Sequence, residues 1–288
     1  QHLIVQAGGD VLVGNTNPVP GDDSPTATIL EASAYVLIEA EGALRVGYDG
    51  QILSSANSSY VRVEAAQAFV TGRIQAGATF DTGNNLAVWS GADAEVVLNL
   101  DDNLVVGGNG LDPDTFSIIG SGGNILSSGD LTVRTGKDAF ENGIGLSENS
   151  AIVIDGDGGG ALTPAHPGMI LIESTGEIEN FGLIESRDNG SDIEMRSDLQ
   201  IFNDGLVEAD DRLVIAGGRS NDGVGIYITG VTFDPSGTRI SGGTFDTAPG
   251  GSIEMTATDR IYIGGVVGQL RTEAGESVAD AETISITS

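Results

Sequence analysis

Carboxylates are the most abundant chemically active groups in this sequence. The 288 residues include 42 Asp and Glu but only 12 Lys and Arg, which gives a net charge of −30, and there are two His and no Cys. The lack of cysteine excludes disulfides, thiolate metal sites and cysteine nucleophiles. Nucleic-acid binding is also disfavoured, because contacts with phosphates need Lys and Arg. Carboxylates therefore remain the main resource for metal binding or acid–base chemistry.

Two acidic turns have a spacing that suits calcium, which binds oxygen ligands on flexible, glycine-rich loops. Asp155 and Asp157 alternate with glycines, and Asp112 and Asp114 follow the glycine-rich run 107–111. We therefore expect no cofactor and no transition-metal site; Ca²⁺ is the one candidate ion, and its candidate ligands are Asp155, Asp157, Asp112 and Asp114. The alternative is that these residues form solvated turns between strands.

The sequence offers little else for catalysis. His166 lies in a proline-bounded loop and His2 is next to the N-terminus. No Gly-x-Ser-x-Gly motif frames a nucleophile, so we expect no catalytic residues. The alternative is a polysaccharide-active lyase or hydrolase that uses surface Asp residues as general acid and base. Aromatic residues, which line most sugar clefts, make up only 5% of the chain.

The rest of the sequence alternates apolar and polar residues in short runs. Examples are 35–39 (YVLIE), 60–64 (YVRVE), 152–154 (IVI) and 170–173 (ILIE). These runs are rich in β-branched residues and are bounded by Gly, Asn, Asp or Ser, as strands are. The pattern predicts an all-β protein.

Some of these runs recur. Residues 35–40 (YVLIEA) match residues 60–65 (YVRVEA), and a further step of 25 residues predicts that Leu86 and Val88 belong to a third copy. Three more pairs of segments resemble each other: 180–186 with 203–209, Ile193 with Ile253 (read as three units of 20 residues) and 211–215 with 259–263.

A degenerate period of 20–25 residues, built of short strands, indicates a solenoid. One coil of strands cannot bury its own inward side chains, but the next coil, about 4.8 Å away, covers them and completes the backbone hydrogen bonds. We predict a right-handed parallel β-helix of roughly twelve coils. Residues 34–267 would form the solenoid, 1–33 an N-terminal strand, cap or assembly segment, and 268–288 a strand-like tail. Two β-sandwich domains are the main alternative.

Two segments carry a family resemblance. Residues 250–267 (GGSIEMTATDRIYIGGVV) and 191–218 (SDIEMRSDLQIFNDGLVEADDRLVIAGG) resemble the coils of filamentous-haemagglutinin-type adhesins. The resemblance extends over residues 34–267. It implies a secreted bacterial protein with a right-handed β-helix and an adhesive role at the cell surface.

Both ends of the chain have the sequence character of strands, and neither resembles a helical cap. A solenoid without caps leaves an unpaired strand edge at each end. We therefore predict self-association through Leu3, Ile4 and Val5 at one end and Ile284 and Ile286 at the other. The alternatives are that each terminus folds over its own rod or that the solenoid continues into a longer chain.

The leading hypothesis is an extracellular structural or adhesive protein, not an enzyme, that polymerises head to tail into a filament, biofilm matrix or surface layer. The acidic, cysteine-free composition and a chain that begins at Gln1 favour secretion. The expected partners are further copies and cell-surface glycans. No nucleic acid is expected, and no stretch has the ~20 apolar residues needed for membrane insertion. A non-catalytic glycan-binding module is a further alternative.

Overall fold

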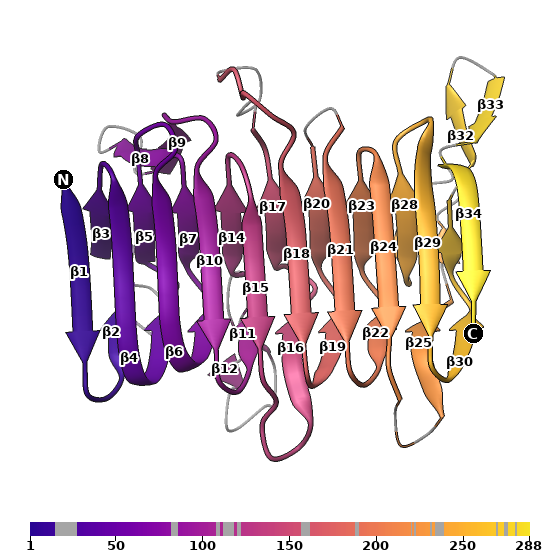
Figure 1. The fold of residues 1–288 in the computed structure, drawn as a ribbon, viewed down its shortest axis with the longest axis horizontal. Coiled ribbons are helices and arrows are strands. Elements are labelled where there is room, and N and C mark those ends of the chain that lie inside the picture. Colours follow the sequence, from indigo (N-terminus) through magenta and orange to yellow (C-terminus); the bar gives the residue numbers. More distant parts are fainter. Residues whose placement is uncertain are drawn as a thin grey trace.

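The computed structural model describes most of the chain, and it is all-β. The described residues are 1–14, 28–81, 86–107, 110–111, 118–119, 122–156, 162–187, 190–219, 221, 223–230, 232–233, 239–268, 270–273, 276–279 and 281–288. Within these ranges the chain forms strands and turns and no helix, which confirms the all-β prediction. The strands stack in parallel along the long axis of the molecule, with the two termini at opposite ends (Figure 1).

The largest set of stacked strands, here called the front column, runs the full length of the molecule. Each strand pairs in parallel with the next. The column comprises β1 (His2–Ala7), β4 (Tyr35–Val46), β6 (Tyr60–Val70), β10 (Glu95–Leu100), β15 (Leu131–Thr135), β18 (Met169–Ser174), β21 (Asp192–Ser197), β24 (Arg212–Gly217), β29 (Gly251–Ala257) and β34 (Ala281–Thr287).

Two further parallel columns complete each layer of the stack. The lower column comprises β2 (Val11–Val13), the C-terminal parts of β4 and β6, β11 (Leu104–Val106), β16 (Asn142–Leu146), β19 (Glu177–Asn180), β22 (Ile201–Asn203), β25 (Val224–Ile228) and β30 (Arg260–Ile263). The back column comprises β3 (Thr28–Ala32), β5 (Gly50–Ser54), β7 (Arg73–Ala76), β14 (Asn124–Ser127), β17 (Ala151–Ile154), β20 (Leu183–Ser186), β23 (Leu206–Ala209), β28 (Thr244–Thr247) and β31 (Val266–Val267). Strands from the segments 1–33 and 268–288 belong to the same columns as strands from 34–267.

Antiparallel hairpins interrupt the repeat and change its spacing. They are β8 (Ala78–Asp81) with β9 (Leu86–Trp89), β12 (Gly110–Leu111) with β13 (Ile118–Ile119), β26 (Thr232–Phe233) with β27 (Arg239–Ser241), and β32 (Leu270–Glu273) with β33 (Glu276–Ala279). The predicted position of Leu86 and Val88 is wrong because both lie in such a hairpin. Val96, 35 residues after Val61, is the true partner of Val61.

Of the four predicted matches between segments, two are confirmed, one is correct in its row but not in its spacing, and one is wrong. The match of 35–40 with 60–65 is confirmed in register, and Asn180 pairs with Asn203 as expected. Ile193 and Ile253 share a row but are two steps apart, through Leu213. The match of 211–215 with 259–263 is wrong, since the first segment lies in the front column and the second in the lower column.

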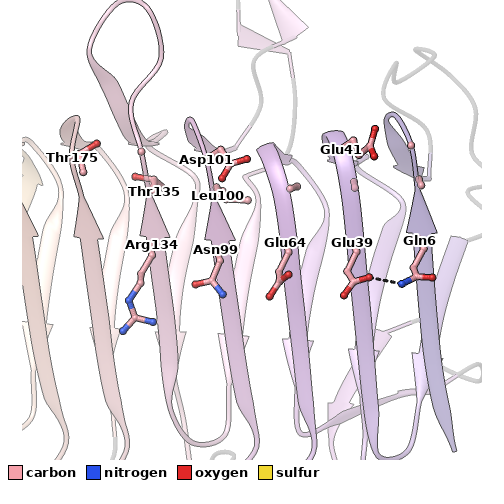
Figure 2. Close-up of a pocket in the computed structure, with 15 residues that line it drawn as sticks. Gln6, Glu39, Glu41, Glu64, Asn99, Leu100, Asp101, Arg134, Thr135 and Thr175 are labelled. Carbon is pink, nitrogen blue, oxygen red and sulfur yellow. Dashed lines mark hydrogen bonds between the residues drawn. The ribbon is translucent and has the colours of Figure 1, made fainter.

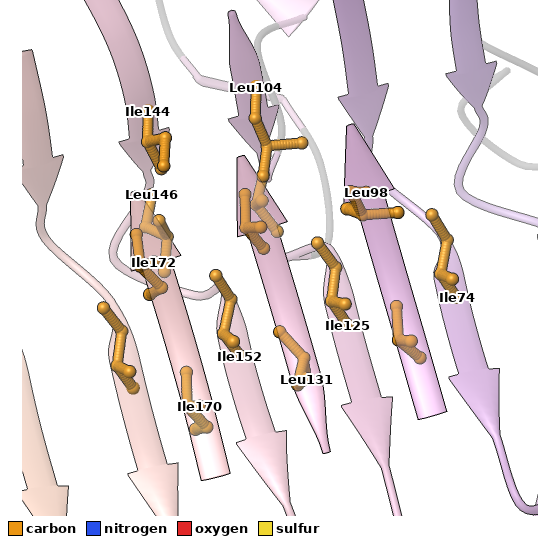
Figure 3. Packing of buried hydrophobic residues seen from close by; sticks show 14 of the residues in the cluster. Ile74, Leu98, Leu104, Ile125, Leu131, Ile144, Leu146, Ile152, Ile170 and Ile172 are labelled. Carbon is orange, nitrogen blue, oxygen red and sulfur yellow. The ribbon is translucent and has the colours of Figure 1, made fainter. Parts of the chain in front are cut away.

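Stacking turns the inward side chains of each column into continuous apolar rows (Figure 3). Strand alternation directs every second side chain inward, and burial of each Val, Leu or Ile contributes about 1.5–3 kcal/mol. One front row comprises Leu3, Val36, Val61, Val96, Leu131, Ile170, Ile193, Leu213, Ile253 and Ile284. The other comprises Val5, Ile38, Val63, Leu98, Val133, Ile172, Met195, Ile215, Met255 and Ile286.

The buried rows predict that two neighbouring residues of β18 contribute very differently to the free energy of unfolding. Ile172 is fully buried between Val133 and Met195, whereas Leu171 points outward and is partly exposed. Ile172→Ala should lower the free energy of unfolding by about 2–5 kcal/mol through the cavity that it leaves. Leu171→Ala should cost less than half as much. Urea unfolding followed by circular dichroism measures both, and equal losses would contradict the assignment of the inward row.

Candidate functional site: the open ends of the stack

The N-terminal end of the stack exposes an edge strand. Among the described strands, β1 pairs only with β4. Leu3 and Val5 point inward and pack against the core, each opposite a buried residue of β4, but they remain partly exposed. Ile4 points to the outer face and is 53% exposed. The structure therefore brings the three predicted residues together on one open strand, although they face opposite sides of it.

The C-terminal end is open in the same way. Among the described strands, β34 pairs only with β29, where Ile284 lies opposite Ile253 and Ile286 opposite Met255. Ile253 and Met255 are buried, whereas Ile284 is 44% and Ile286 47% exposed. All four occupy the same two inward rows. The terminal pair is exposed because no further strand covers it.

Exposed apolar side chains are concentrated at these two ends. Of the nine large hydrophobic residues that are exposed among the described residues, six lie on the end strands β1, β2, β30 and β34. They are Ile4, Leu12, Tyr262, Ile263, Ile284 and Ile286. Sequence reasoning missed Leu12, Tyr262 and Ile263. These three residues are recognised as end residues only when the strand register is known, because the register places them in the rows of the lower column.

The central stretches of β1 and β34 also lack the charges that usually protect a sheet edge, although β34 includes Glu282 near its start and β30 begins at Arg260. Residues 2–7 and 283–287 contain no Asp, Glu, Lys or Arg, in a chain whose net charge is −30. Natural proteins commonly block exposed strand edges with charged side chains, especially lysine. These two stretches therefore offer an uncharged edge on which another strand could pair.

A long groove runs across the front strands near the N-terminal end (Figure 2). It has a volume of about 950 Å³, and carboxylates from adjacent strands, Glu39 and Glu64, face it in register. Gln6 Nε2 donates a hydrogen bond to Glu39 Oε2 at 2.5 Å, and Arg62 forms an ion pair with Glu64 at 2.5 Å. The described lining residues include no aromatic side chain, so the groove does not offer the sugar-stacking platform that a polysaccharide-active enzyme would need.

A smaller hollow, of about 480 Å³, lies on the outer face of the lower column. In its outward row, Gly145 sits between Val105 and Glu179. A Cβ atom added at Gly145 would meet nothing within 4 Å, so the missing side chain leaves open space. The exposed ring of Phe181 and the exposed carboxylate of Glu179 line the same hollow. An aromatic ring next to a hydrogen-bond acceptor in a small concavity can bind a polar ring-shaped molecule.

Only one of the predicted calcium ligands lies within the described residues. Asp155 is buried, and its Oδ2 lies 3.8 Å from the guanidinium of Arg187, which also contacts Glu185 at 2.6 Å. The hydrogen bond to Glu185, together with the nearby carboxylates, raises the pKa of Arg187 above its ordinary value. Asp112, Asp114 and Asp157 lie outside the described residues. Among those that are described, no group of three or more His, Asp or Glu side chains could hold a metal ion.

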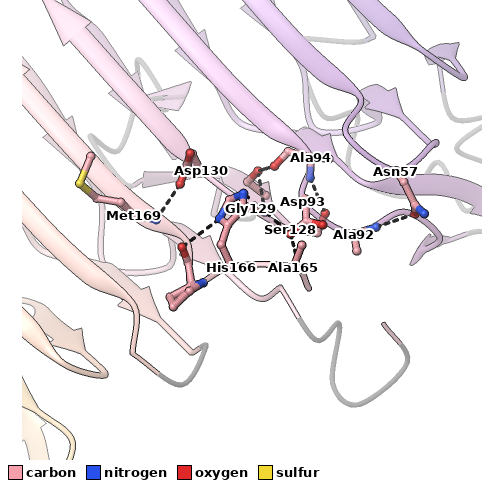
Figure 4. Close-up of polar contacts among 12 residues, drawn as sticks. Asn57, Ala92, Asp93, Ala94, Ser128, Gly129, Asp130, Ala165, His166 and Met169 are labelled. Carbon is pink, nitrogen blue, oxygen red and sulfur yellow. Dashed lines mark hydrogen bonds and ion pairs between the residues drawn. The ribbon is translucent and has the colours of Figure 1, made fainter. Parts of the chain in front are cut away.

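Figure 4 shows the surroundings of His166, which lies near Asp93 and Ser128. Its ring is 56% exposed, with Nε2 4.0 Å from Asp93 and Nδ1 3.1 Å from the carbonyl of Pro167. The contact with the Pro167 carbonyl, supported by the charges of Asp130 and Asp93, raises the pKa of His166. Ser128 is buried, and its hydroxyl donates a hydrogen bond to the carbonyl of Gly91 at 2.6 Å. That hydroxyl serves to fix a turn.

No protein-family model, curated protein or solved structure matches the chain.

The described part of the chain contains no helix long and apolar enough to cross a membrane.

The pairing of Asp155 with Arg187 leads to a prediction about calcium. Asp155→Asn should lower the free energy of unfolding by about 1 kcal/mol, a modest loss because Arg187 is half exposed. The loss should be the same in calcium chloride and in EDTA, because Asp155 forms an ion pair with the guanidinium of Arg187. Thermal unfolding in both buffers measures it. If calcium stabilised the unmodified protein but not the variant, the carboxylate would instead be a calcium ligand.

Proposed function

We propose that this protein is an extracellular structural or adhesive β-solenoid whose copies join end to end into a filament, matrix or surface layer. The proposal is carried by one observation: six of the nine exposed large hydrophobic residues among the described residues lie on the strands at the two ends. Contacts between two different surfaces of a protein produce an open-ended filament unless the rotation between copies closes them into a ring. Function then resides in the shape and repetition of the assembly.

We further infer that the columns wind as a right-handed parallel β-helix, the hand that parallel crossovers strongly prefer. From the length of the repeat alone, about twelve coils are expected. The front column contains ten strands among the described residues. The parts of the chain spent on antiparallel hairpins account for the difference between these two values.

The charge of the chain is compatible with this assembly if the ends are neutral. Two bodies that each carry a net charge of −30 repel one another, and dissolved salt screens that repulsion beyond about 8–10 Å. The apolar ends attract only at contact. Assembly should therefore be favoured at high ionic strength, which suits an acidic protein that acts outside the cell.

Lysines in the inward row of β1 should abolish the assembly. In the double variant Leu3→Lys/Val5→Lys, two charges would have to be buried in any joint that uses this edge. The matched control is Thr132→Lys/Val214→Lys, which adds the same charge at outward positions in the middle of the front column. Light scattering after gel filtration, with negative-stain microscopy, measures the size of the particles.

We expect elongated particles from the unmodified protein and from the control, and monomers from the Leu3/Val5 variant. Circular dichroism should show that all three proteins are folded. Monomers of the unmodified protein at every concentration and salt level would reject self-association.

The hollow above Gly145 favours a second candidate function, the binding of neutral or amino-sugar glycans. Its carboxylates would repel uronates, and Phe181 provides a ring on which a sugar can stack.

Gly145→Val should fill the hollow without disturbing the strand, because the added atoms enter open space. We expect at least a tenfold loss of affinity for a glycan that binds the unmodified protein, with unchanged stability. Ala216→Val, at an outward position of β24, is the control. Glycan-array screening followed by calorimetry provides the test. Unchanged binding by the Gly145 variant, or no binding by any of the three proteins, would reject this site.

A further inference from the structure

The stack ends on an incomplete layer. At the N-terminal end, β1, β2 and β3 provide one strand to each of the three columns. At the C-terminal end, the lower column ends at β30 and the back column at β31, whereas β34 extends the front column by one more strand. Figure 1 shows β34 as the last front strand, reached after the β32–β33 hairpin. The front column is therefore one strand longer than the other two.

The extra front strand determines which strands of a second copy can pair with this end. If β1 of an incoming copy paired with β34, its β2 and β3 would each lie two strand spacings, about 9.6 Å, from β30 and β31. That separation leaves an apolar gap one strand wide in two of the three columns. If β1 instead paired with β29, all three columns would meet at the normal spacing of about 4.8 Å. In this second joint, β1 occupies the place of β34.

The residues at the two ends match the second joint in detail. Leu3 and Val11 are eight residues apart, as are Ile253 and Ile261, so the front and lower inward rows have the same offset in both end layers. The joint would bring Val11 and Val13 of β2 opposite Ile261 and Ile263 of β30.

The outward row of the lower column and the strands of the back column support the same joint. Leu12 is 60% and Tyr262 52% exposed, and both occupy the outward row of the lower column. Tyr262 already stacks on Tyr227 at 4.7 Å, and Leu12 of the incoming copy would cover its other face. In the back column, Leu30 of β3 would lie opposite Val267 of β31. Only the joint without β34 covers Leu12, Tyr262 and Ile263.

We propose that β34 is an exchangeable strand that occupies the docking site for β1 of a second copy, and that assembly proceeds when β1 displaces it from β29. This inference rests on the proposed end-to-end function. In the isolated protein, Ile284 and Ile286 of β34 cover Ile253 and Met255; in the assembly, Leu3 and Val5 of the next copy cover them. The exchange loses one strand pairing and gains three, and the resulting filament is polar.

A disulfide that locks β34 in place provides the test. Glu254 and Ser285 are directly opposite each other on the outer face of β29 and β34. Adjacent parallel strands have a Cα–Cα spacing of about 4.8 Å, which is within the range of a disulfide. The chain has no cysteine, so Glu254→Cys/Ser285→Cys would contain the only two thiols. The control is Leu171→Cys/Glu194→Cys, which links β18 to β21 in the middle of the stack.

We expect the oxidised Glu254/Ser285 variant to remain monomeric and to assemble after reduction, whereas the control assembles in both states. A protein that lacks residues 281–288 should assemble at a lower concentration than the full chain. If the oxidised variant assembles like the control, β34 stays in place and the exchange is wrong, although end-to-end assembly survives. If the full chain, the reduced variant and the truncated protein all stay monomeric, the proposed function itself fails.

Discussion

The parallel stacking of inward aliphatic rows is the interaction on which this structure depends. No layer has enough inward surface to form a core alone, so each buries its Val, Leu and Ile side chains against the layers on both sides. The two front rows run without interruption from Leu3 to Ile284 and from Val5 to Ile286. This kind of packing sets no limit on the number of layers. Its first and last layers expose what every other layer buries.

The same constraint explains why the ends are the most distinctive surface of the molecule. Along the sides, outward carboxylates such as Glu64 and Glu173 form ion pairs with arginines, and outward aromatic rings of the lower column, such as Phe202 and Tyr227, stack on one another. At the ends, inward positions face solvent, and residues 2–7 and 283–287 carry no charge in a strongly acidic chain. A net charge of −30 keeps the sides of two molecules apart and leaves end-to-end contact as the least repulsive approach.

The sequence alone predicted the strands and the parallel stacking, because alternation and self-similarity follow directly from a buried row. The match of 35–40 with 60–65 is in register for this reason. The position of Leu86 and Val88 failed because an inserted hairpin changes the spacing without changing the local pattern. Three-residue strands such as β2 are too short to show alternation, so Leu12 escaped notice. The contact between Asp155 and Arg187 joins neighbouring turns of the back column, and no local pattern reveals such a contact.

The axial repeat of an assembled filament distinguishes the exchange of β34 from simple end-to-end stacking. If β1 of each copy replaces β34 of the previous one, every copy contributes nine layers, one for each front strand from β1 to β29. At about 4.8 Å per layer, the power spectrum of filament images should show a repeat of about 43 Å. A repeat of about 48 Å would mean that β34 remains in the stack and the exchange does not occur. Molecules that associate side by side, with no axial repeat of either length, would contradict the continuous stack as the basis of function.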